Sequence, residues 1–190
     1  PDVLDVFGLQ WVDNPHISPD GRQIVFERMG FDVMKDRKQS SLWRIDSDGK
    51  NLRPLADSGS GAAWSADGRR MAFVANDNSK SQIQMHWFDT GQTTSITDLT
   101  ESPRNLSWSP DGRWLAFNMR MPAEQAPLAK MPSPPKGAEW AAPVKVIESV
   151  IYRVDGGGYI DPGYSQVFVV SSEGGAARQL TSGKYNFNGQ

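Results

Sequence analysis

A nine-residue motif occurs three times in this chain and constrains its fold more than any other feature. Each copy begins Ser-(Pro/Ala)-Asp-Gly-Arg and ends in Phe, and the copies cover Ser18–Phe26, Ser65–Phe73 and Ser109–Phe117. Their starts lie 47 and then 44 residues apart. Internal repeats of about 40–50 residues are typical of propellers and other repeat architectures. We therefore expect a chain built from three similar units.

The motif itself predicts a tight turn followed by a strand. Pro presets φ, an Asp side chain bonds nearby backbone N–H groups, and Gly accepts a positive φ. After the turn, Ile24, Met71 and Leu115 occupy one position, and a Phe follows two residues later on the same face. The residue between them is Val or Ala, so both faces of the strand are apolar. This pattern predicts sheets that pack between neighbouring sheets.

Each unit continues with a second hairpin. Strands are predicted at Leu42–Ile45 and Met85–Phe88, and a third hairpin is predicted to begin at Val167–Val170. Four short strands per unit are typical of a propeller blade. The predicted fold class is therefore all-β: a partial β-propeller of about three four-stranded blades, with a long insertion in the third.

The spacing also predicts blade boundaries. Blade 1 is expected at about 11–57, blade 2 at about 60–100 and blade 3 at about 104–182, with the insertion within 121–164. The insertion is Pro-rich in its first half, reads as a strand at 144–152, and has a Gly156–Gly158 run that predicts a turn.

The end of the chain suggests that another blade follows. Leu180-Thr181 parallels Leu99-Thr100, so residues 184–190 are expected to start a further blade. Because closed propellers usually need about 4–8 blades, residues 1–190 are expected to be the N-terminal portion of a larger propeller domain.

Composition excludes several classes of function. The 20 basic and 22 acidic residues leave a net charge of −2, without the basic excess that nucleic-acid binding requires. The absence of Cys excludes thiol catalysis and cysteine-based metal sites. No apolar run is long enough to span a membrane. No metal and no cofactor are expected, because Lys50 breaks the calcium-loop pattern that Asp46–Gly49 begins.

The chain contains no recognisable catalytic group. The nucleophile elbow Gly-x-Ser-x-Gly is absent, and Ser58–Gly61 lacks its first Gly. His16 and His86 have no Ser and carboxylate partners suggested by the pattern, so both are expected to be structural.

Two features of the insertion are candidates for binding. Tyr152, Arg153, Asp155 and Tyr159 flank the Gly run, where they form either a polar, aromatic surface at a cavity mouth or a local structural brace. In the first case Arg153 is able to bind a peptide carboxylate or carbonyl. Trp140 is a candidate interface residue or a local packing residue.

The blades and the insertion together resemble a known family. The segments Tyr152–Tyr159, Gln166–Val170 and Gly174–Thr181, with the opening Asn14–Gly21, are similar to the propeller of prolyl oligopeptidase-family serine peptidases, in the acylaminoacyl-peptidase branch. The Ser-Pro-Asp-Gly blades alone also resemble TolB.

This resemblance implies a non-catalytic propeller that gates access of short peptides to a C-terminal α/β-hydrolase domain absent from this chain. The implied partners are that domain and short peptides, and exposed blade faces imply self-association of the chain alone. The implied location is bacterial, periplasmic or secreted, with the cytoplasm left open. The alternative is a TolB-like periplasmic scaffold that binds proteins. A glycosidase on the central channel is a third reading, but it requires paired carboxylates on one face, and the acidic residues fall mostly at turns.

Overall fold

The computed structural model describes residues 8–32, 34, 37–77, 80–123, 136–137, 153–154, 158–159 and 163–187. Every helix or strand element assigned in these ranges is a β-strand, and every strand pairing is antiparallel. The expected all-β class is confirmed.

The strands form three four-stranded sheets and one two-stranded hairpin. Sheet 1 consists of β1 (Trp11–Ile17), β2 (Gln23–Asp32), β3 (Arg37–Asp46) and β4 (Arg53–Ala56). Sheet 2 consists of β5 (Ser60–Trp64), β6 (Arg70–Asp77), β7 (Lys80–Trp87) and β8 (Thr93–Ser95). Sheet 3 consists of β9 (Pro103–Trp108), β10 (Trp114–Pro122), β13 (Gly163–Ser171) and β14 (Arg178–Gln179). The hairpin pairs β11 (Arg153–Val154) with β12 (Gly158–Tyr159).

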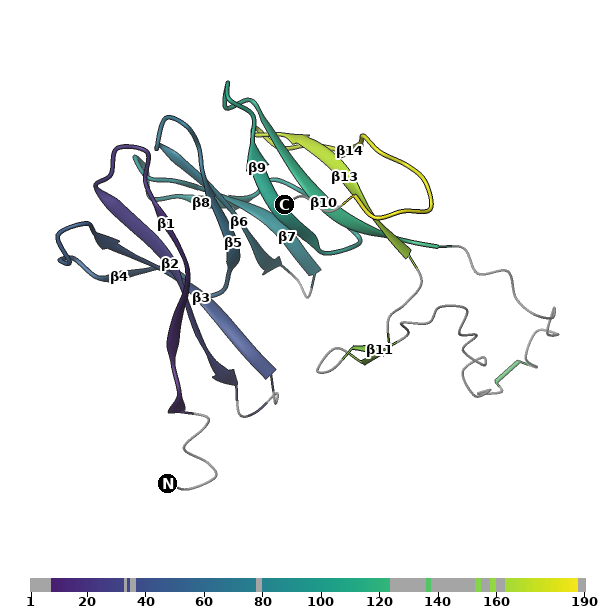
Figure 1. Ribbon diagram of the computed structural model, residues 1–190, viewed down its shortest axis with the longest axis horizontal. Helices are drawn as coiled ribbons and strands as arrows, with labels where there is room; N and C mark the ends of the chain where they lie inside the picture. The colour runs from purple at the N-terminus through teal and green to yellow at the C-terminus, as the bar shows by residue number, and fades with distance from the viewer. Residues whose placement is uncertain are drawn as a thin grey trace.

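The three sheets stand side by side in a row (Figure 1). Strand order within each sheet follows chain order, and only sheet 3 is interrupted, between β10 and β13. The first strands contact one another from sheet to sheet, β1 against β5 and β5 against β9. Four-stranded sheets that repeat around an axis are the blades of a propeller. The predicted partial propeller, with its insertion in the third blade, is confirmed.

The Ser-x-Asp-Gly turn has the same hydrogen bonds in all three sheets. In sheet 2 the Ser65 hydroxyl donates to Asp67 Oδ1 (2.6 Å), and its oxygen lies 3.0 Å from the Arg70 backbone N–H, which donates to it. Asp67 Oδ1 also accepts from the backbone N–H of Arg69 (3.0 Å), and the Gly68 N–H donates to the Ser65 carbonyl (2.9 Å). Gly68 has a φ of 68°, which explains the invariance of Gly across the three copies. The same contacts recur at Ser18–Asp20 and Ser109–Asp111.

A left-handed backbone conformation recurs four residues before each motif Ser, and the motif sequence does not predict it. The backbone is left-handed at Asn14 (φ 46°), Gly61 (φ 61°) and Asn105 (φ 53°), and the strand register shifts beside each of them. One extra residue in one strand is a β-bulge, and Asn and Gly tolerate its positive φ. The bulge lets the Gly61 N–H donate to the buried carboxylate of Glu27 in sheet 1 (2.9 Å). It therefore contributes to the contact between sheets.

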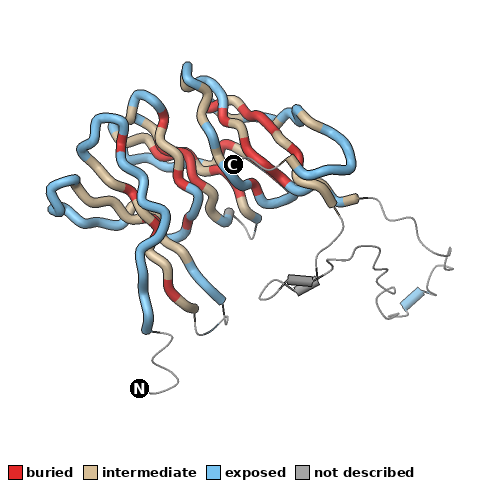
Figure 2. The backbone as a smooth tube through the Cα atoms, in the orientation of Figure 1, coloured by how far each residue is buried: buried red, intermediate tan, exposed pale blue. Residues whose placement is uncertain are grey.

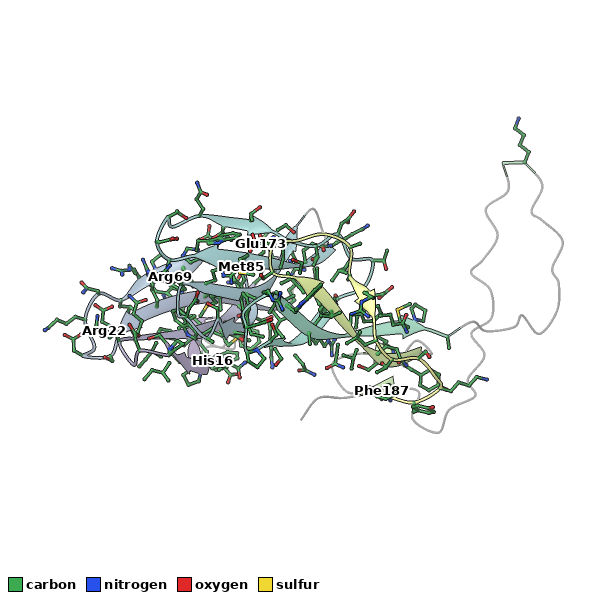
Figure 3. All side chains as sticks on the ribbon, turned by 90° about the horizontal axis from the view of Figure 1, so that it is seen from above. His16, Arg22, Arg69, Met85, Glu173 and Phe187 are labelled. Atoms are coloured by element: carbon green, nitrogen blue, oxygen red, sulfur yellow. The ribbon has the colours of Figure 1, made fainter. Side chains whose placement is uncertain are left out.

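Two apolar cores lie between the sheets, and their buried segments run along the facing strands (Figure 2). On β6, Met71 and Phe73 face sheet 1 while Ala72 between them faces sheet 3, because alternate side chains of a strand point to opposite faces. Met85 of β7 lies in the interior of the molecule (Figure 3). Burying one such large side chain stabilises the fold by about 1.5–3 kcal/mol. The first core contains Val25, Leu42, Ala62, Met71 and Phe73, and the second contains Ala72, Ile83, Met85, Ile96, Leu99, Leu115, Phe117, Met119, Phe168 and Val170.

The outer face of sheet 1 is less covered. Ile24 and Phe26 are half-buried, whereas the aligned Met71 and Phe73 of sheet 2 are fully buried. The difference arises because no sheet among the described residues packs on that face of sheet 1. Self-association through this face stays a prediction.

The Trp that precedes the motif ties its sheet to the one before. Trp108 Nε1 donates to the carbonyl of Ala63 (2.9 Å), and Trp64 Nε1 donates to the carbonyl of His16 (3.2 Å). Both acceptors lie two residues before the motif Ser of the preceding sheet. Ile17 takes the Trp position in the first copy, has no N–H to donate from its side chain, and is 61% exposed.

In sheets 2 and 3, a buried Gln bonds the segment that follows the last strand or its end. Gln82 Oε1 accepts from the Thr97 hydroxyl (2.8 Å), and Gln166 Oε1 accepts from the Thr181 hydroxyl (2.8 Å). Each Thr oxygen also accepts from the backbone N–H that follows the Gln. The two pairs are equivalent, so Thr181 corresponds to Thr97.

This equivalence corrects the sequence parallel between Leu180-Thr181 and Leu99-Thr100. The backbone N–H of Leu180 donates to the Val167 carbonyl, and the backbone N–H of Ile96 donates to the Ile83 carbonyl in the same way. Leu180 therefore corresponds to Ile96. The parallel is wrong by three residues, because a matching Leu-Thr pair does not reveal which Thr bonds the buried Gln.

The strands that flank the insertion continue into the range expected for it. β10 and β13 pair without a break from Trp114 opposite Ser171 to Pro122 opposite Gly163. The strands thus extend two residues at each end into the range 121–164 expected as the insertion. The strand expected at 144–152 lies outside the described residues. The strands β11 and β12, on either side of residues 155–157, pair antiparallel.

The Trp108 hydrogen bond predicts a specific loss of stability. Trp108→Phe keeps an aromatic ring but removes the donor to Ala63, so the free energy of unfolding is expected to fall by about 1 kcal/mol. Urea denaturation measures this change. Trp114→Phe is the matched control, since Trp114 is 44% exposed. Equal losses in the two variants contradict the role of the Trp108 N–H.

The motif carboxylates predict a loss of stability in acid. Hydrogen bonds from Ser109 and Arg113 lower the pKa of Asp111 to about 2. A lowered folded-state pKa means that the stabilisation is complete above the unfolded pKa of about 3.9 and disappears as the pH falls toward 2. Denaturation curves between pH 6 and pH 2 are expected to show a weaker pH dependence for Asp111→Asn than for the wild type. An unchanged pH dependence contradicts this account.

Candidate functional site

The structure places two of the predicted cavity-mouth residues opposite each other. Arg153 of β11 pairs with Tyr159 of β12 across the small hairpin. Tyr152 and Asp155 lie outside the described residues, as does Trp140. The roles assigned to all five stay predictions.

A second group of polar and aromatic side chains lies between sheets 1 and 2. We call Arg44, Trp64, His86 and Phe88 the rim cluster. Trp64 and Phe88 stack with ring centroids 4.5 Å apart and an interplanar angle of 18°. His86 meets Phe88 edge-on at 4.7 Å, and the Arg44 guanidinium lies 5.6 Å from the Phe88 ring centroid. Arg44 belongs to sheet 1. Trp64 and His86 belong to sheet 2, and Phe88 follows β7 directly.

Arg44 occupies a position that is apolar in the other sheets. Val25, Ala72 and Ala116 occupy the same position of the motif in the three sheets. Arg44 lies opposite Val25, whereas the residue opposite Ala72 is Met85 and the residue opposite Ala116 is Val169. The Arg44 side chain therefore faces sheet 2. Its Nε is buried and has no hydrogen-bond partner, the one such side-chain atom among the described residues. Burial, and secondarily the charge of neighbouring Arg53, lowers the pKa of Arg44.

His86 is buried near a positive charge. It is 6% exposed, and its Nδ1 lies 2.8 Å from the Thr93 hydroxyl. Burial lowers its pKa, and the charge of Arg44 lowers it further. His86 was expected to be a structural residue, and its contacts with Thr93 and Phe88 are packing and orienting contacts.

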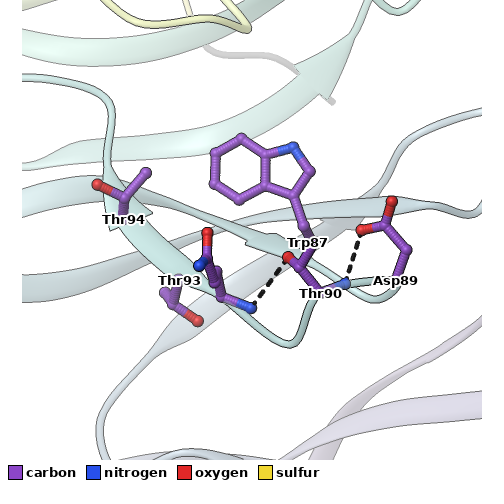
Figure 4. Close-up of a pocket in the computed structure, with 6 residues that line it drawn as sticks. Trp87, Asp89, Thr90, Thr93 and Thr94 are labelled. Atoms are coloured by element: carbon purple, nitrogen blue, oxygen red, sulfur yellow. Dashed lines mark hydrogen bonds between the residues drawn. The ribbon is translucent and has the colours of Figure 1, made fainter.

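A hollow of about 570 Å³ lies at the β7–β8 turn (Figure 4). Its polar groups are partly used within the turn: Asp89 Oδ1 accepts from the Thr90 N–H (2.8 Å), and the Thr90 hydroxyl accepts from the Gln92 N–H (3.3 Å). Asp89 is the only ionisable group in its wall, so the hollow brings no acid and base together. Trp87, Asp89, Thr90, Gln92, Thr93 and Thr94 line it.

Within the described ranges, no group of three or more His, Asp or Glu side chains is placed to hold a metal ion. The same part of the chain has no helix long and apolar enough to cross a membrane.

The rim cluster was not identified from the sequence. The signal for it is Arg44 in the strand Leu42–Ile45, where alternation places a charged residue on the core-facing side. The sequence does not show which aromatic residue of the next sheet Arg44 meets, because that depends on how sheets 1 and 2 pack.

The rim cluster predicts a coupled titration. Arg44→Gln is expected to raise the pKa of His86, because it removes a nearby positive charge that disfavours imidazolium. The rise is only partial, since burial is the larger cause and persists. NMR titration of the His86 ring resonances measures it. Arg22→Gln, at an exposed Arg of sheet 1, is the control for net charge (Figure 3). A His86 pKa that does not change in Arg44→Gln contradicts the coupling.

No known family model matches this chain. Over 184 residues it is 24% identical to the uncharacterized peptidase YuxL of Bacillus subtilis, covering 95% of the chain and 27% of YuxL. Over 78 residues it is 31% identical to dipeptidyl-peptidase 5 of Porphyromonas gingivalis, covering 40% of the chain and 11% of that protein. The chain thus spans about a quarter or less of the curated relatives that it matches.

Solved structures share the fold. Pyrococcus horikoshii acylaminoacyl peptidase matches with a TM-score of 0.66 and 14% identity, over 92% of this chain and 25% of that one. A protein described as TolB, from Agrobacterium tumefaciens, matches with a TM-score of 0.52 and 16% identity, over 93% of this chain and 64% of that one. The chain therefore has the fold of the propeller region of acylaminoacyl peptidase and of TolB, and it is a distant sequence relative of YuxL and dipeptidyl-peptidase 5.

Proposed function

We propose that this chain is the non-catalytic propeller part of a serine peptidase of the acylaminoacyl-peptidase or oligopeptidase type. In this proposal the propeller limits access of short peptides to a C-terminal α/β-hydrolase domain. The observation that carries the proposal is the match to the peptidase YuxL over 95% of this chain. A match of that length necessarily includes most of the long segment between β10 and β13 as well as the blades.

The structural comparison supports the same choice. The TM-score is 0.66 for acylaminoacyl peptidase and 0.52 for TolB, at nearly equal coverage of this chain. A TolB-like scaffold remains the alternative, and the experiment below distinguishes the two.

The proposal divides the chain into blades. Blade 1 covers about 11–57, blade 2 about 60–100 and blade 3 about 104–182, and residues 184–190 lead into a further blade. The backbone N–H of Phe187 donates to the Ser165 carbonyl (2.8 Å), so the chain returns to the side of β13 after β14 (Figure 3). That course is the one expected of a strand that crosses from one blade to the next.

The β11–β12 hairpin is proposed to lie at the mouth of the peptide cavity. Arg153 and Tyr159, which pair across the hairpin, are proposed to contact the peptide together with Tyr152 and Asp155. An Arg side chain binds carboxylate or carbonyl oxygens through two parallel hydrogen bonds, which suits the end of a short peptide. Trp140 is proposed to lie at the interface with the hydrolase domain.

The gene beyond the codon for Gln190 provides the first test. We expect further Trp-Ser-Pro-Asp-Gly blades and then a domain with Gly-x-Ser-x-Gly followed by Asp and His. The purified product is expected to react with a fluorophosphonate probe at that Ser and to cleave short N-acylated peptides but not casein. The variant with that Ser replaced by Ala is the control, and residues 1–190 alone are expected to show no hydrolysis.

Two outcomes contradict the proposal. A reading frame that closes the propeller and stops has no serine nucleophile and favours the scaffold alternative. Rapid cleavage of casein by the intact enzyme leaves the peptidase assignment standing but rejects the gating role.

A further inference from the structure

The contrast between two arginines that lie between sheets points to a binding site. Arg70, between sheets 2 and 3, lies over the Trp108 ring at 5.1 Å and donates to the Gly112 carbonyl (2.9 Å), the Ser172 hydroxyl (3.2 Å) and Glu173 (3.2 Å). Arg44 lies over an aromatic ring in the same way, but its Nε is buried without an acceptor. Arg carries five N–H donors, and none of those on Arg44 is bonded to another described residue. Its Nε is enclosed by protein atoms, so a ligand meets the terminal N–H groups.

The Arg44 side chain is already held in place. Phe88 lies under the guanidinium and is itself stacked on Trp64. A planar guanidinium fixed on an aromatic ring loses little freedom when it binds a ligand. The two terminal nitrogens of a guanidinium carry parallel N–H groups that match two oxygens of one carboxylate or phosphate.

The local charge selects an anion. Arg53 of β4 is paired directly with Arg44 of β3, so two positive charges adjoin. The nearby Asp46 carboxylate offsets part of this charge, but its Oδ2 accepts from Asn51 Nδ2 (2.7 Å) and not from Arg44. His86, the remaining titratable member of the cluster, lies on the opposite sheet. A neutral ligand leaves the repulsion between the two arginines unchanged, whereas an oxyanion weakens it and accepts from the terminal N–H groups of Arg44.

We propose that Arg44, with Arg53 beside it, forms a binding site for an oxyanion, a carboxylate or phosphate group, at the rim between sheets 1 and 2. The site belongs entirely to sheets that this chain contains, and it does not depend on the peptidase assignment. Arg44 supplies the paired donors, Arg53 supplies charge, and Phe88 and Trp64 hold the Arg44 plane.

NMR of the arginine Nε–Hε groups in the 190-residue chain tests the site directly. The chain is titrated with sodium phosphate and, separately, with sodium acetate, while sodium chloride keeps the ionic strength constant. We expect a saturable shift of the Arg44 Nε–Hε resonance with at least one of the two anions. Arg44→Lys keeps the charge but loses the paired donors, so binding is expected to weaken about tenfold or more. Because this variant has no Nε–Hε resonance at position 44, its binding is followed by the backbone amide shift of Phe88, calibrated on the wild type.

Two further variants separate the site from general charge effects. Arg53→Gln is expected to weaken binding while the Arg44 resonance still shifts. Arg22→Gln removes the same charge from an exposed position of sheet 1 and is expected to bind as the wild type does. Each variant is compared only after its amide spectrum shows the wild-type fold.

The outcomes decide both the site and its ligand. A shift with phosphate alone identifies a phosphate site, and a shift with acetate identifies a site that accepts a carboxylate. No saturable shift with either anion, or equal weakening in Arg22→Gln and Arg53→Gln, overturns the proposal.

Discussion

The rest of the structure depends on face-to-face packing of sheets that are too small to be stable alone. A four-stranded sheet with two apolar faces cannot bury both within itself, so each sheet requires a neighbour on either side. Sheet 2 has both neighbours, and its Met71, Phe73 and Ala72 are fully buried. Sheet 1 has one, and its Ile24 and Phe26 are half-buried although the motif is the same. Burial thus follows the position of a sheet in the row and not its local sequence.

Hydrogen bonds between sheets then fix their alignment. Apolar packing is not directional, so it does not by itself set how one blade is placed against the next. The Trp64 and Trp108 indole groups, the Gly61 N–H on Glu27, and Arg70 each join a defined atom of one sheet to a defined atom of its neighbour. Arg44 departs from this arrangement, because its position between the sheets gives it an aromatic ring but no acceptor.

The two proposals concern different parts of the chain. The peptidase role is based on similarity along the whole sequence and assigns peptide contacts to the insertion, around Arg153 and Tyr159. The anion site is based on contacts within sheets 1 and 2, around Arg44. The blades and the insertion are therefore assigned separate binding roles, as is common where a regular fold carries variable loops. Either proposal is able to fail without the other.

The sequence by itself determined the repeat, the turn chemistry and the four-stranded unit, because these depend on residues close together in the chain. Ser65, Asp67 and Gly68 bond one another or their immediate neighbours, so their pattern is readable without the fold. Three features were decided by the tertiary structure alone. They are the equivalence of Thr181 with Thr97, the bulges at Asn14, Gly61 and Asn105, and the lack of a hydrogen-bond acceptor for Arg44 Nε. Each of these depends on which residue of another strand or sheet lies opposite, and that choice is made by packing between segments far apart in sequence.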